Sequence, residues 1–401
     1  MKIAIALWDL NISGGTQRQA LELAKNLQKI GHDVKVYAVY YNDEKCYPDL
    51  IKKLGVQYLY KTQDEVGEVA EGLLYRFFRP WRELINEKIY YELLDLIDSD
   101  IELLNCHDYR IYPLGAKFKE RYKKPTVYMM NDLPIYKARL NSIKEIIKLL
   151  LAPIRGKLFY THRHKHYIAS YDRIIVLDEY NKRKLKHNID LDSVVVRGGL
   201  DINRFQYVQR VKPNDVLRIL INGIFFPWRR FEDVVNALNV LKKKNIDFEL
   251  FHVGTDKRDP FYANEIYKLV DGYNLNDKVK FHGHVNDEEL INLYQSSDIF
   301  VYPNSPQTWG LAVFEAMACG TPVIVSTGCG ASEVLTDGES ALLVPPKSPE
   351  KISDAIIKLK ENPNLWRRLS TNGRKFVEEN IRWDLYTKNM LRVFEEVLRN
   401  K

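Results

Sequence analysis

Two adjacent arginines, Arg229 and Arg230, follow an apolar run that ends at Asn222 and precede a helical pattern. Guanidinium groups stay charged over the whole working pH range and bond phosphate oxygens in pairs. Their place just after an expected strand therefore favours binding of a diphosphate. A solvated basic helix cap, or an ion pair with Glu232 or Asp233, is the alternative explanation.

A lone carboxylate, Glu315, stands in an apolar stretch that follows a loop rich in proline and serine. Its neighbours are Phe314, Ala316, Met317 and Ala318. Burying a charged carboxylate among such residues is costly unless it has a partner. The two hydroxyls of a ribose are one suitable partner, and a neighbouring arginine is the other.

The first half of the chain holds two more candidate sites. Gly14 and Gly15 stand between an apolar run and a helical pattern, where free backbone N–H groups and the helix dipole favour a phosphate. His107 follows the apolar run 101–106 and is expected at the tip of a strand, facing a cleft. A plain strand-to-helix turn, and a histidine bonded to Asp108 or to a loop carbonyl, are the alternatives.

Short apolar runs rich in isoleucine and valine alternate with segments of helical period, and several runs are apolar on both faces. This pattern is typical of parallel strands covered by helices on both sides, so it predicts an α/β fold. The expected strands are 2–7, 33–40, 101–106, 126–130, 173–177, 193–196, 217–222, 248–253, 279–283, 299–302, 322–326 and 341–344. The expected helices include 16–30, 232–244 and one capped by Asn286.

The strands fall into two series of similar size, which predicts two doubly wound domains facing across a cleft. The polar stretch 206–215 separates the two series and contains Pro213. We therefore expect domains at 1–205 and 206–380, with a binding site in the cleft at the carboxyl ends of the strands.

The composition narrows the class of protein. With 45% apolar and 12% aromatic residues in 401 positions, the chain can bury large cores and is not disordered. Its four cysteines lack both C-x-x-C spacing and metal-ligand spacing with histidine, which argues against a disulfide framework or a zinc site. No run reaches the roughly 18 apolar residues of a membrane span, and the first residues are too quickly polar for a signal peptide. We expect a cytoplasmic protein.

From Gly14 to Trp383 the chain resembles the retaining glycosyltransferases of family four, which have the GT-B fold. The most specific stretch is Glu315 followed by Ala-Met-Ala-Cys-Gly-Thr-Pro-Val-Ile. Where the family usually has a second glutamate, seven residues before Glu315, this chain has Gln307. The resemblance implies that 1–205 binds the acceptor, that 206–380 binds a nucleotide sugar, and that a C-terminal helix in 381–401 crosses back to the first domain.

The resemblance also implies which residues bind the donor. Glu315 would hold the ribose, and the backbone of the His284-Val285 loop would read the nucleobase. Ile224 replaces a common arginine of the family, and Arg229 replaces its lysine, so we expect Arg230 to supply the missing cation. The phosphates would be bound by these arginines and by backbone groups of Gly14, Gly15, Gly310, Leu311 and Ala312.

Two residues are implied in catalysis. His107 resembles the family's acceptor-side histidine near the transferred carbon. Gln307 would contact hydroxyls of the transferred sugar, although an amide lacks the negative charge of the usual glutamate. The implied reaction moves a hexose-type sugar, with retention, from a nucleotide diphosphate sugar to a glycan or lipid-linked acceptor in glycan biosynthesis. It needs no cofactor, no metal and no protein nucleophile, because the phosphate-binding groups stabilise the leaving diphosphate.

Other classes of function account for less of the sequence. A catalytically silent GT-B subunit that binds a nucleotide sugar and supports a partner is the main alternative, because Gln307 and Ile224 depart from the family pattern. A sugar-nucleotide epimerase on the same fold is a further one, although the Gly-Thr-Pro-Val-Ile segment favours transfer. Nucleic acid is not an expected partner, because the chain has no arginine-rich arm and no RNA-binding module.

The net charge of +7 has a local origin. Residues 136–167 contain eight lysines and arginines and a single acid, Glu145, so their excess equals that of the whole chain. The same segment includes the apolar run 146–151, which Lys148 interrupts. Two interpretations stay open: docking on the inner face of an anionic membrane or on a phosphorylated lipid carrier, and a solvated helix with one face in the core.

Overall fold

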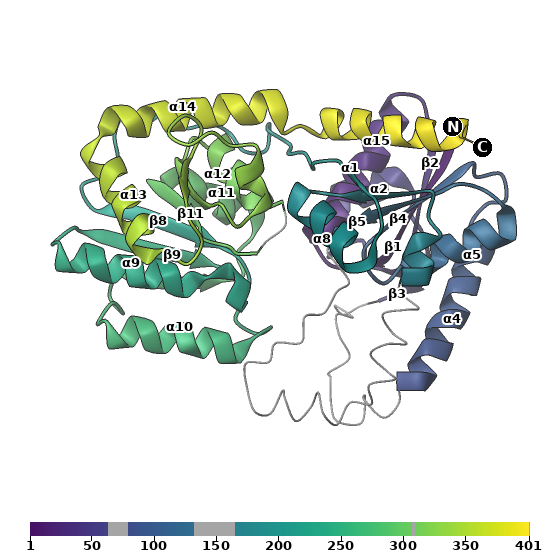
Figure 1. The fold of residues 1–401 in the computed structure, drawn as a ribbon, viewed down its shortest axis with the longest axis horizontal. Helices are drawn as coiled ribbons and strands as arrows, with labels where there is room; N and C mark the ends of the chain where they lie inside the picture. The colour runs from purple at the N-terminus through teal and green to yellow at the C-terminus, as the bar shows by residue number, and fades with distance from the viewer. Residues whose placement is uncertain (63–78, 132–164, 307–308, 401) are drawn as a thin grey trace. The chain divides into compact units, whose positions relative to one another are not determined.

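The computed structural model describes residues 1–62, 79–131, 165–306 and 309–400 (Figure 1). The chain divides into two compact units. Unit one comprises Met1–Val196 and Tyr386–Lys401, and unit two comprises Arg197–Leu385. Each unit is built around its own parallel sheet.

The described part of unit one holds a seven-stranded parallel sheet in the order β3-β2-β1-β4-β5-β6-β7. Its strands are β1 (Lys2–Leu10), β2 (Asp33–Tyr41), β3 (Gln57–Lys61), β4 (Leu103–His107), β5 (Thr126–Met130), β6 (Arg173–Val176) and β7 (Val194–Val195). The central strands β1, β4 and β5 are almost entirely buried, which explains their continuous apolar runs.

Helices cover both faces of this sheet. One face packs against α4 (Arg79–Leu96), α5 (Tyr112–Tyr122) and α8 (Glu179–Ile189) in a single apolar core. On β1 and β2 pack α1 (Gly15–Lys29) and, beside it, α2 (Pro48–Leu54). The buried face of α1 is formed by Ala20, Leu23, Ala24 and Leu27, as the helical spacing predicts.

Unit two contains a six-stranded parallel sheet in the order β10-β9-β8-β11-β12-β13. Its strands are β8 (Leu217–Asn222), β9 (Phe248–Val253), β10 (Val279–Gly283), β11 (Ile299–Tyr302), β12 (Val323–Ser326) and β13 (Leu342–Val344). Its helices are η1 (Pro227–Arg229), α9 (Phe231–Lys243), α10 (Pro260–Gly272), α11 (Asp287–Ser296), α12 (Leu311–Ala318), η2 (Gly330–Glu333), α13 (Pro349–Glu361), α14 (Pro363–Asn380) and the start of α15 (Trp383–Arg399).

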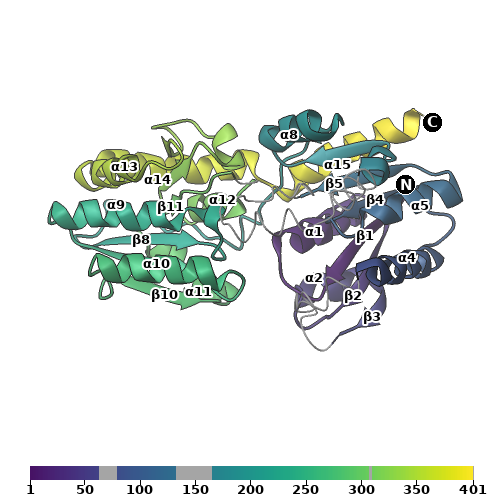
Figure 2. The same ribbon diagram turned by 60° about the horizontal axis from the view of Figure 1, so that its bottom comes forward.

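The helices of unit two form a layer on each face of the sheet. Figure 2 looks onto the layer in which α10, α9 and α13 follow one another, and these helices share one apolar core with the strands. The other layer brings α11 and α14 against α12. Between the layers, the loops that leave the carboxyl ends of β8, β10 and β11 lie at one edge of the sheet.

All the strands expected from apolar runs are present, with shifts of at most a few residues at their ends. The prediction missed β3, a short edge strand that begins and ends on a polar residue and whose Tyr58 and Tyr60 are exposed. The helix expected at 16–30 ends before Gly31, whose φ of +91° requires the left-handed conformation. Asn286 caps α11 by accepting a hydrogen bond from the Glu289 N–H.

The boundary between the units lies at Val196–Arg197, earlier than the expected join at 205/206. The reason is that the following residues pair within unit two. Leu200 forms a bridge with Arg382, and its N–H donates to the carbonyl of Ile381 at 3.1 Å. The return to unit one falls inside α15, after Leu385, rather than at 380/381.

No helix in the described part of the chain combines the length and apolar character needed to cross a bilayer. Of the basic segment 136–167, the residues up to 164 lie outside the described ranges. The four cysteines are all buried free thiols.

Candidate active site

The donor-binding candidates of unit two come from the loops at the carboxyl ends of its strands. Arg229 and Arg230 follow β8, His284 and Val285 follow β10, and Gly310 follows β11. In doubly wound sheets this edge is where ligands bind. The loops after β8 and β11 are joined directly, because the Ser305 N–H donates to the carbonyl of Trp228 at 2.8 Å.

Arg229 ends the short helix η1 and is held by two side chains of the loop after β11. Its Nη1 donates to the hydroxyl of Tyr302 at 3.1 Å. With the amide oxygen of Asn304 turned toward it, Nη1 also donates to that oxygen at 2.8 Å. Burial raises the pKa of Tyr302 to about 12, although Arg229 opposes the shift, so the hydroxyl keeps its proton at neutral pH.

Arg230 adopts a left-handed backbone conformation, with φ of +56°, where it caps α9. Its guanidinium donates to both carboxylate oxygens of Asp233, at 2.9 and 2.7 Å, and lies 2.6 Å from Glu232. Arg230, which was expected to supply the cation that Ile224 lacks, is therefore already paired with two acids. This is the ion-pair alternative that the sequence left open.

Glu315 lies on α12, about one turn from Leu311, which begins the helix. Its Oε2 accepts a hydrogen bond from the hydroxyl of Tyr294 at 2.9 Å, and that hydroxyl accepts one from Asn222 Nδ2 at 2.9 Å. Tyr294 thus orients the carboxylate of Glu315. Burial, with Glu315 nearby, raises the pKa of Tyr294 well above its usual range.

The N-terminus of α12 has no side-chain cap, and Gly310 stands at the N-cap position with φ of +75°. Leu311 and Ala312, the first two residues of the helix, are half-buried. Uncapped backbone N–H groups at this end can bind an anion. Gln307 lies outside the described residues.

His284 is exposed and Val285 is half-buried in the short connection between β10 and α11. Gly283 ends β10 with φ of +67°, and its carbonyl accepts a hydrogen bond from the Gly254 N–H at 2.7 Å. The backbone of this connection therefore lies beside the end of β9, at the same edge as the loop after β8.

In unit one, α1 begins at Gly15, directly behind the loop that leaves β1. Gly14 is its N-cap and no side chain caps the helix. The loop is fastened by Gln17 Nε2, which donates to the carbonyl of Asp9 at 3.1 Å, and by the Tyr47 hydroxyl, which donates to the carbonyl of Gly14 at 3.2 Å. The glycine pair thus presents helix N–H groups at the carboxyl edge of the sheet, as expected.

His107 is the last residue of β4 and is fully buried. Its Nε2 lies 2.8 Å from Asn105 Oδ1. Because a carbonyl oxygen only accepts, Nε2 carries the proton and Nδ1 is left as an acceptor, for which the structure shows no partner. Burial lowers the pKa of His107 to about 3, so the ring is neutral at physiological pH.

Asp108, considered above as a partner for His107, instead binds backbone groups. It accepts hydrogen bonds from the N–H groups of Trp8, Arg110 and Ile111. Burial nevertheless raises its pKa to about 7.

Sequence analysis missed a second carboxylate at this edge. Asp9, near the end of β1, pairs with Arg110 at 3.3 Å, and burial raises its pKa to about 6. The available signal was an acid inside an apolar strand, because Asp9 follows six apolar residues of β1 and precedes Leu10.

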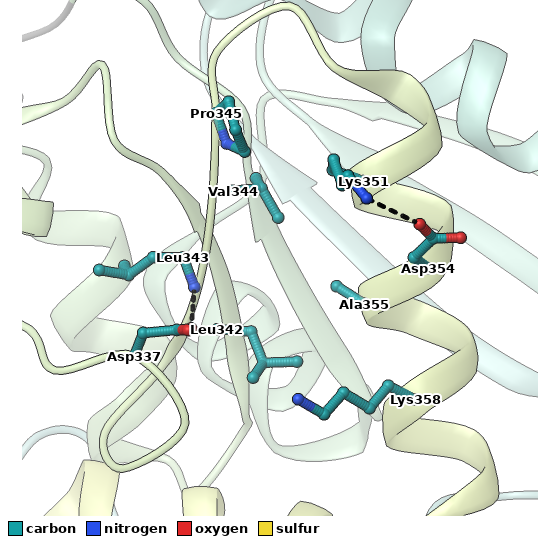
Figure 3. Close-up of a pocket in the computed structure, with 9 residues that line it drawn as sticks. All are labelled: Asp337, Leu342, Leu343, Val344, Pro345, Lys351, Asp354, Ala355 and Lys358. Atoms are coloured by element: carbon teal, nitrogen blue, oxygen red, sulfur yellow. Dashed lines mark hydrogen bonds and ion pairs between the residues drawn. The ribbon is translucent and has the colours of Figure 1, made fainter.

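Metal-binding clusters and cavities were sought throughout the described residues. No set of three or more His, Cys, Asp or Glu side chains in the described ranges is arranged to hold a metal ion. Figure 3 shows a pocket of about 180 Å³ between β13 and α13. Its lining includes Leu342, Val344, Lys351 and Asp354, and it contains none of the candidate residues.

Two family profiles match the chain in succession. The profile described as Glycosyltransferase Family 4 matches residues 13–204, and the profile described as Glycosyl transferases group 1 matches residues 203–376. The chain belongs to this glycosyltransferase family. The two profiles meet close to the boundary between the two units.

Known proteins resemble this glycosyltransferase over almost its full length. An uncharacterised glycosyltransferase of Methanocaldococcus jannaschii is 25% identical over 98% of both chains. Mannosylfructose-phosphate synthase of Agrobacterium fabrum is 23% identical over 96% of this chain and 86% of its own. The crystal structure of Anabaena HepE with UDP has a TM-score of 0.73 at 16% identity, over 99% and 100% of the two chains, and HepE has also been solved with UDP-glucose. The GT-B architecture of two Rossmann-like domains is thereby confirmed.

The buried, neutral His107 predicts a pH-dependent stability. Its pKa is about 3 in the folded state and about 6.5 in the unfolded state, so between these values the unfolded chain binds more protons and stability falls as the pH falls. Between pH 7 and pH 5, His107→Gln should lose about 2 kcal/mol less stability than the wild type. Urea unfolding of both proteins at the two pH values, followed by circular dichroism, measures this difference. If the difference in unfolding free energy between the two proteins is the same at pH 7 and pH 5, the prediction is contradicted.

Proposed function

We propose that this glycosyltransferase moves a hexose-type sugar, with retention and without a metal or cofactor, from a nucleotide diphosphate sugar to a glycan or lipid-linked acceptor. The observation that carries the proposal is the set of groups at one edge of the unit-two sheet. Arg229 offers a guanidinium, α12 offers an uncapped N-terminus, and Glu315 follows on the same helix. A diphosphate and a ribose need these three kinds of group.

On the donor side, the proposed reaction depends on charge that develops on the departing diphosphate. Arg229 and the first N–H groups of α12 would stabilise it, and preorganised donors of this kind usually make the largest contribution to catalysis. Glu315, oriented by Tyr294, would accept hydrogen bonds from the ribose hydroxyls. Gln307 would contact hydroxyls of the transferred sugar. HepE has been solved with UDP-glucose, so UDP sugars are the first donors to test.

On the acceptor side, His107 would act as a neutral group. With a pKa of about 3 it is too weak a base to take the proton of an acceptor hydroxyl, but its Nδ1 can accept a hydrogen bond from one. The departing phosphate oxygen lies on the face that the acceptor attacks in a retaining transfer, so we assign the proton to it. No protein nucleophile takes part in this scheme.

The proposed function is tested by turnover of nucleotide sugars by the purified chain. UDP-, GDP- and ADP-hexoses are incubated with soluble and lipid-linked glycan acceptors, and products are identified by mass spectrometry and by the NMR coupling of the new anomeric proton. We expect one donor to be used, the donor's anomeric configuration to be kept, and activity to persist in excess EDTA. Loss of activity that Mg²⁺ or Mn²⁺ restores would overturn metal independence. Binding without turnover of any donor would favour the silent-subunit alternative.

The two arginines after β8 should differ in their effect on donor binding. Arg229→Ala should lower kcat/KM for the donor about a hundredfold, because it removes the charged donor for the diphosphate. Arg230→Ala should leave the donor KM within about twofold but reduce stability by roughly 2 kcal/mol, because buried Asp233 loses its counter-ion. Steady-state kinetics and urea unfolding separate the two effects. An equal rise in donor KM for both variants would show that Arg230 supplies the missing cation after all.

We also propose that the basic segment 136–167 docks on an anionic membrane surface or on a phosphorylated lipid carrier, which would make the enzyme peripheral to the inner face of the membrane. Each basic residue near such a surface contributes about 1 kcal/mol. Lys144→Glu with Lys148→Glu should therefore weaken co-sedimentation with phosphatidylglycerol vesicles by at least about tenfold. Lys351→Glu with Lys375→Glu, two exposed lysines of unit two, is the matched control. Equal binding by both double variants would argue for the solvated-helix interpretation.

A further inference from the structure

We propose that Tyr302 and Asn304 are positioning residues that hold Arg229 against the N-terminus of α12 and so prepare the diphosphate site. This inference rests on the proposed function, because it concerns the same site in unit two. Neither residue is among the donor-binding candidates of the sequence. Tyr302 is the last residue of β11, and Asn304 lies in the loop that leads from β11 to α12, the helix that contains Glu315.

The three side chains form a closed network of hydrogen bonds. Arg229 Nη1 donates to the Tyr302 hydroxyl at 3.1 Å and to the Asn304 amide oxygen at 2.8 Å. The Tyr302 hydroxyl donates to the same amide oxygen at 2.9 Å, and the Asn304 amide nitrogen donates to the main-chain carbonyl of Arg229 at 3.1 Å. Both the head of Arg229 and its backbone are therefore fixed from one loop.

This arrangement determines which part of the guanidinium remains for a ligand. An arginine has five N–H donors, and the two on Nη1 are used by Tyr302 and Asn304. Nε is buried and has no hydrogen-bond partner among the described residues. The edge formed by Nε and Nη2 is thus left over, and two parallel N–H groups are the geometry that a phosphate accepts. The network turns this edge, rather than Nη1, into the ligand-binding side.

Tyr302 also touches the other diphosphate-binding element. A Cβ atom on Gly310 would lie 2.9 Å from Tyr302 Cε1 and 3.1 Å from its hydroxyl oxygen, so the N-cap of α12 rests directly on the tyrosine ring. One rigid side chain therefore contacts both the guanidinium and the helix start. The distance between these two anion-binding groups is set by the width of that ring.

Burial makes the network stiff. Tyr302 is 2% exposed and Asn304 is fully buried, so water does not compete for their hydrogen bonds.

Gly223 allows Arg229 to lie close, because a Cβ atom there would be 3.1 Å from Arg229 Nε. Within the loop 223–230, which is described in full, Ile224 carries no charge and Arg230 is paired with two acids. The placing of one guanidinium consequently decides how the diphosphate is bound.

The test measures the part of nucleotide affinity that comes from the second phosphate. Calorimetry gives the Kd of UDP, GDP and ADP and of the corresponding monophosphates. For the base that binds, the monophosphate Kd is divided by the diphosphate Kd, and this ratio is compared between variants. Tyr302→Phe and Asn304→Ala should each reduce this ratio about fivefold to tenfold, with the monophosphate Kd little changed. Tyr273→Phe is the matched control, because it removes a hydroxyl that binds Asn236 elsewhere in unit two. It should leave the ratio unchanged.

A double-mutant cycle separates positioning from general damage to the fold. If Tyr302 acts through Arg229, then Tyr302→Phe should have no further effect on the ratio when Arg229 is already alanine. A residue that only supports the fold would lower the ratio by the same factor in both backgrounds. Should Tyr302→Phe fail to fold by circular dichroism, the same cycle with Asn304→Ala gives the answer.

The inference is overturned if the wild type prefers the diphosphate and neither variant reduces that preference, or if their effects are additive with Arg229→Ala. The proposed function fails in a different way, because then no nucleoside diphosphate would bind to the wild type or no nucleotide sugar would be turned over. The inference is supported if the ratio falls in both variants and if neither substitution lowers it further when Arg229 is already alanine.

Discussion

A nucleoside diphosphate carries more negative charge than a single arginine can neutralise, so the diphosphate site proposed for unit two depends on two groups together, the Arg229 guanidinium and the N-terminus of α12. Neither is strong enough alone at the surface of a protein, where water screens charge. Their effect depends on a fixed separation, which the ring of Tyr302 provides between Arg229 and Gly310. The buried end of β11 and the layers of helices behind it hold that ring in place. The rest of unit two can be understood as support for this one spacing.

The backbone at the same edge shows how closely the loops must approach. Gly254 follows β9 with φ of +145°, and a Cβ atom there would lie 2.0 Å from the carbonyl oxygen of Gly223. Only glycine allows these two strand ends to meet. The Gly223 carbonyl in turn accepts a hydrogen bond from His252, whose pKa burial lowers to about 4. Glycine and neutral groups thus bring the loop of Arg229 into position without adding a second charge.

The sequence predicted the strands well because parallel strands buried on both faces are read directly from apolar runs. It missed β3, since an edge strand with exposed tyrosines has no such run. For Arg230 it favoured phosphate binding and left an ion pair as the alternative. Residue type and position alone cannot separate these two roles, because both require an arginine at this place. The left-handed backbone at Arg230, which turns its side chain toward Asp233, is a property of the turn and not of the local composition. Tyr302 and Asn304 stand shortly before the most specific stretch, but their bonds to Arg229 join residues 73 and 75 positions apart in the chain.

The two units offer opposite hydrogen-bonding chemistry at the edges of their sheets, and this contrast bears on which ligand each one binds. Among the described residues of unit two, the groups at the proposed diphosphate site are donors, namely the remaining N–H groups of Arg229 and the first N–H groups of α12, although His252 Nδ1 in β9 is an unpartnered acceptor. Among the described residues of unit one, the unpartnered buried atoms beside the strand ends include the acceptors Asp9 Oδ1, Asn11 Oδ1, His107 Nδ1 and Asn131 Oδ1. Burial keeps His107 neutral, and Arg110 at 3.3 Å balances the charge of Asp9, so these groups add little net charge to this edge. Phosphates need donors and hydroxyls can supply donors, so this contrast supports the proposal that unit two binds the nucleotide and unit one a hydroxyl-bearing acceptor.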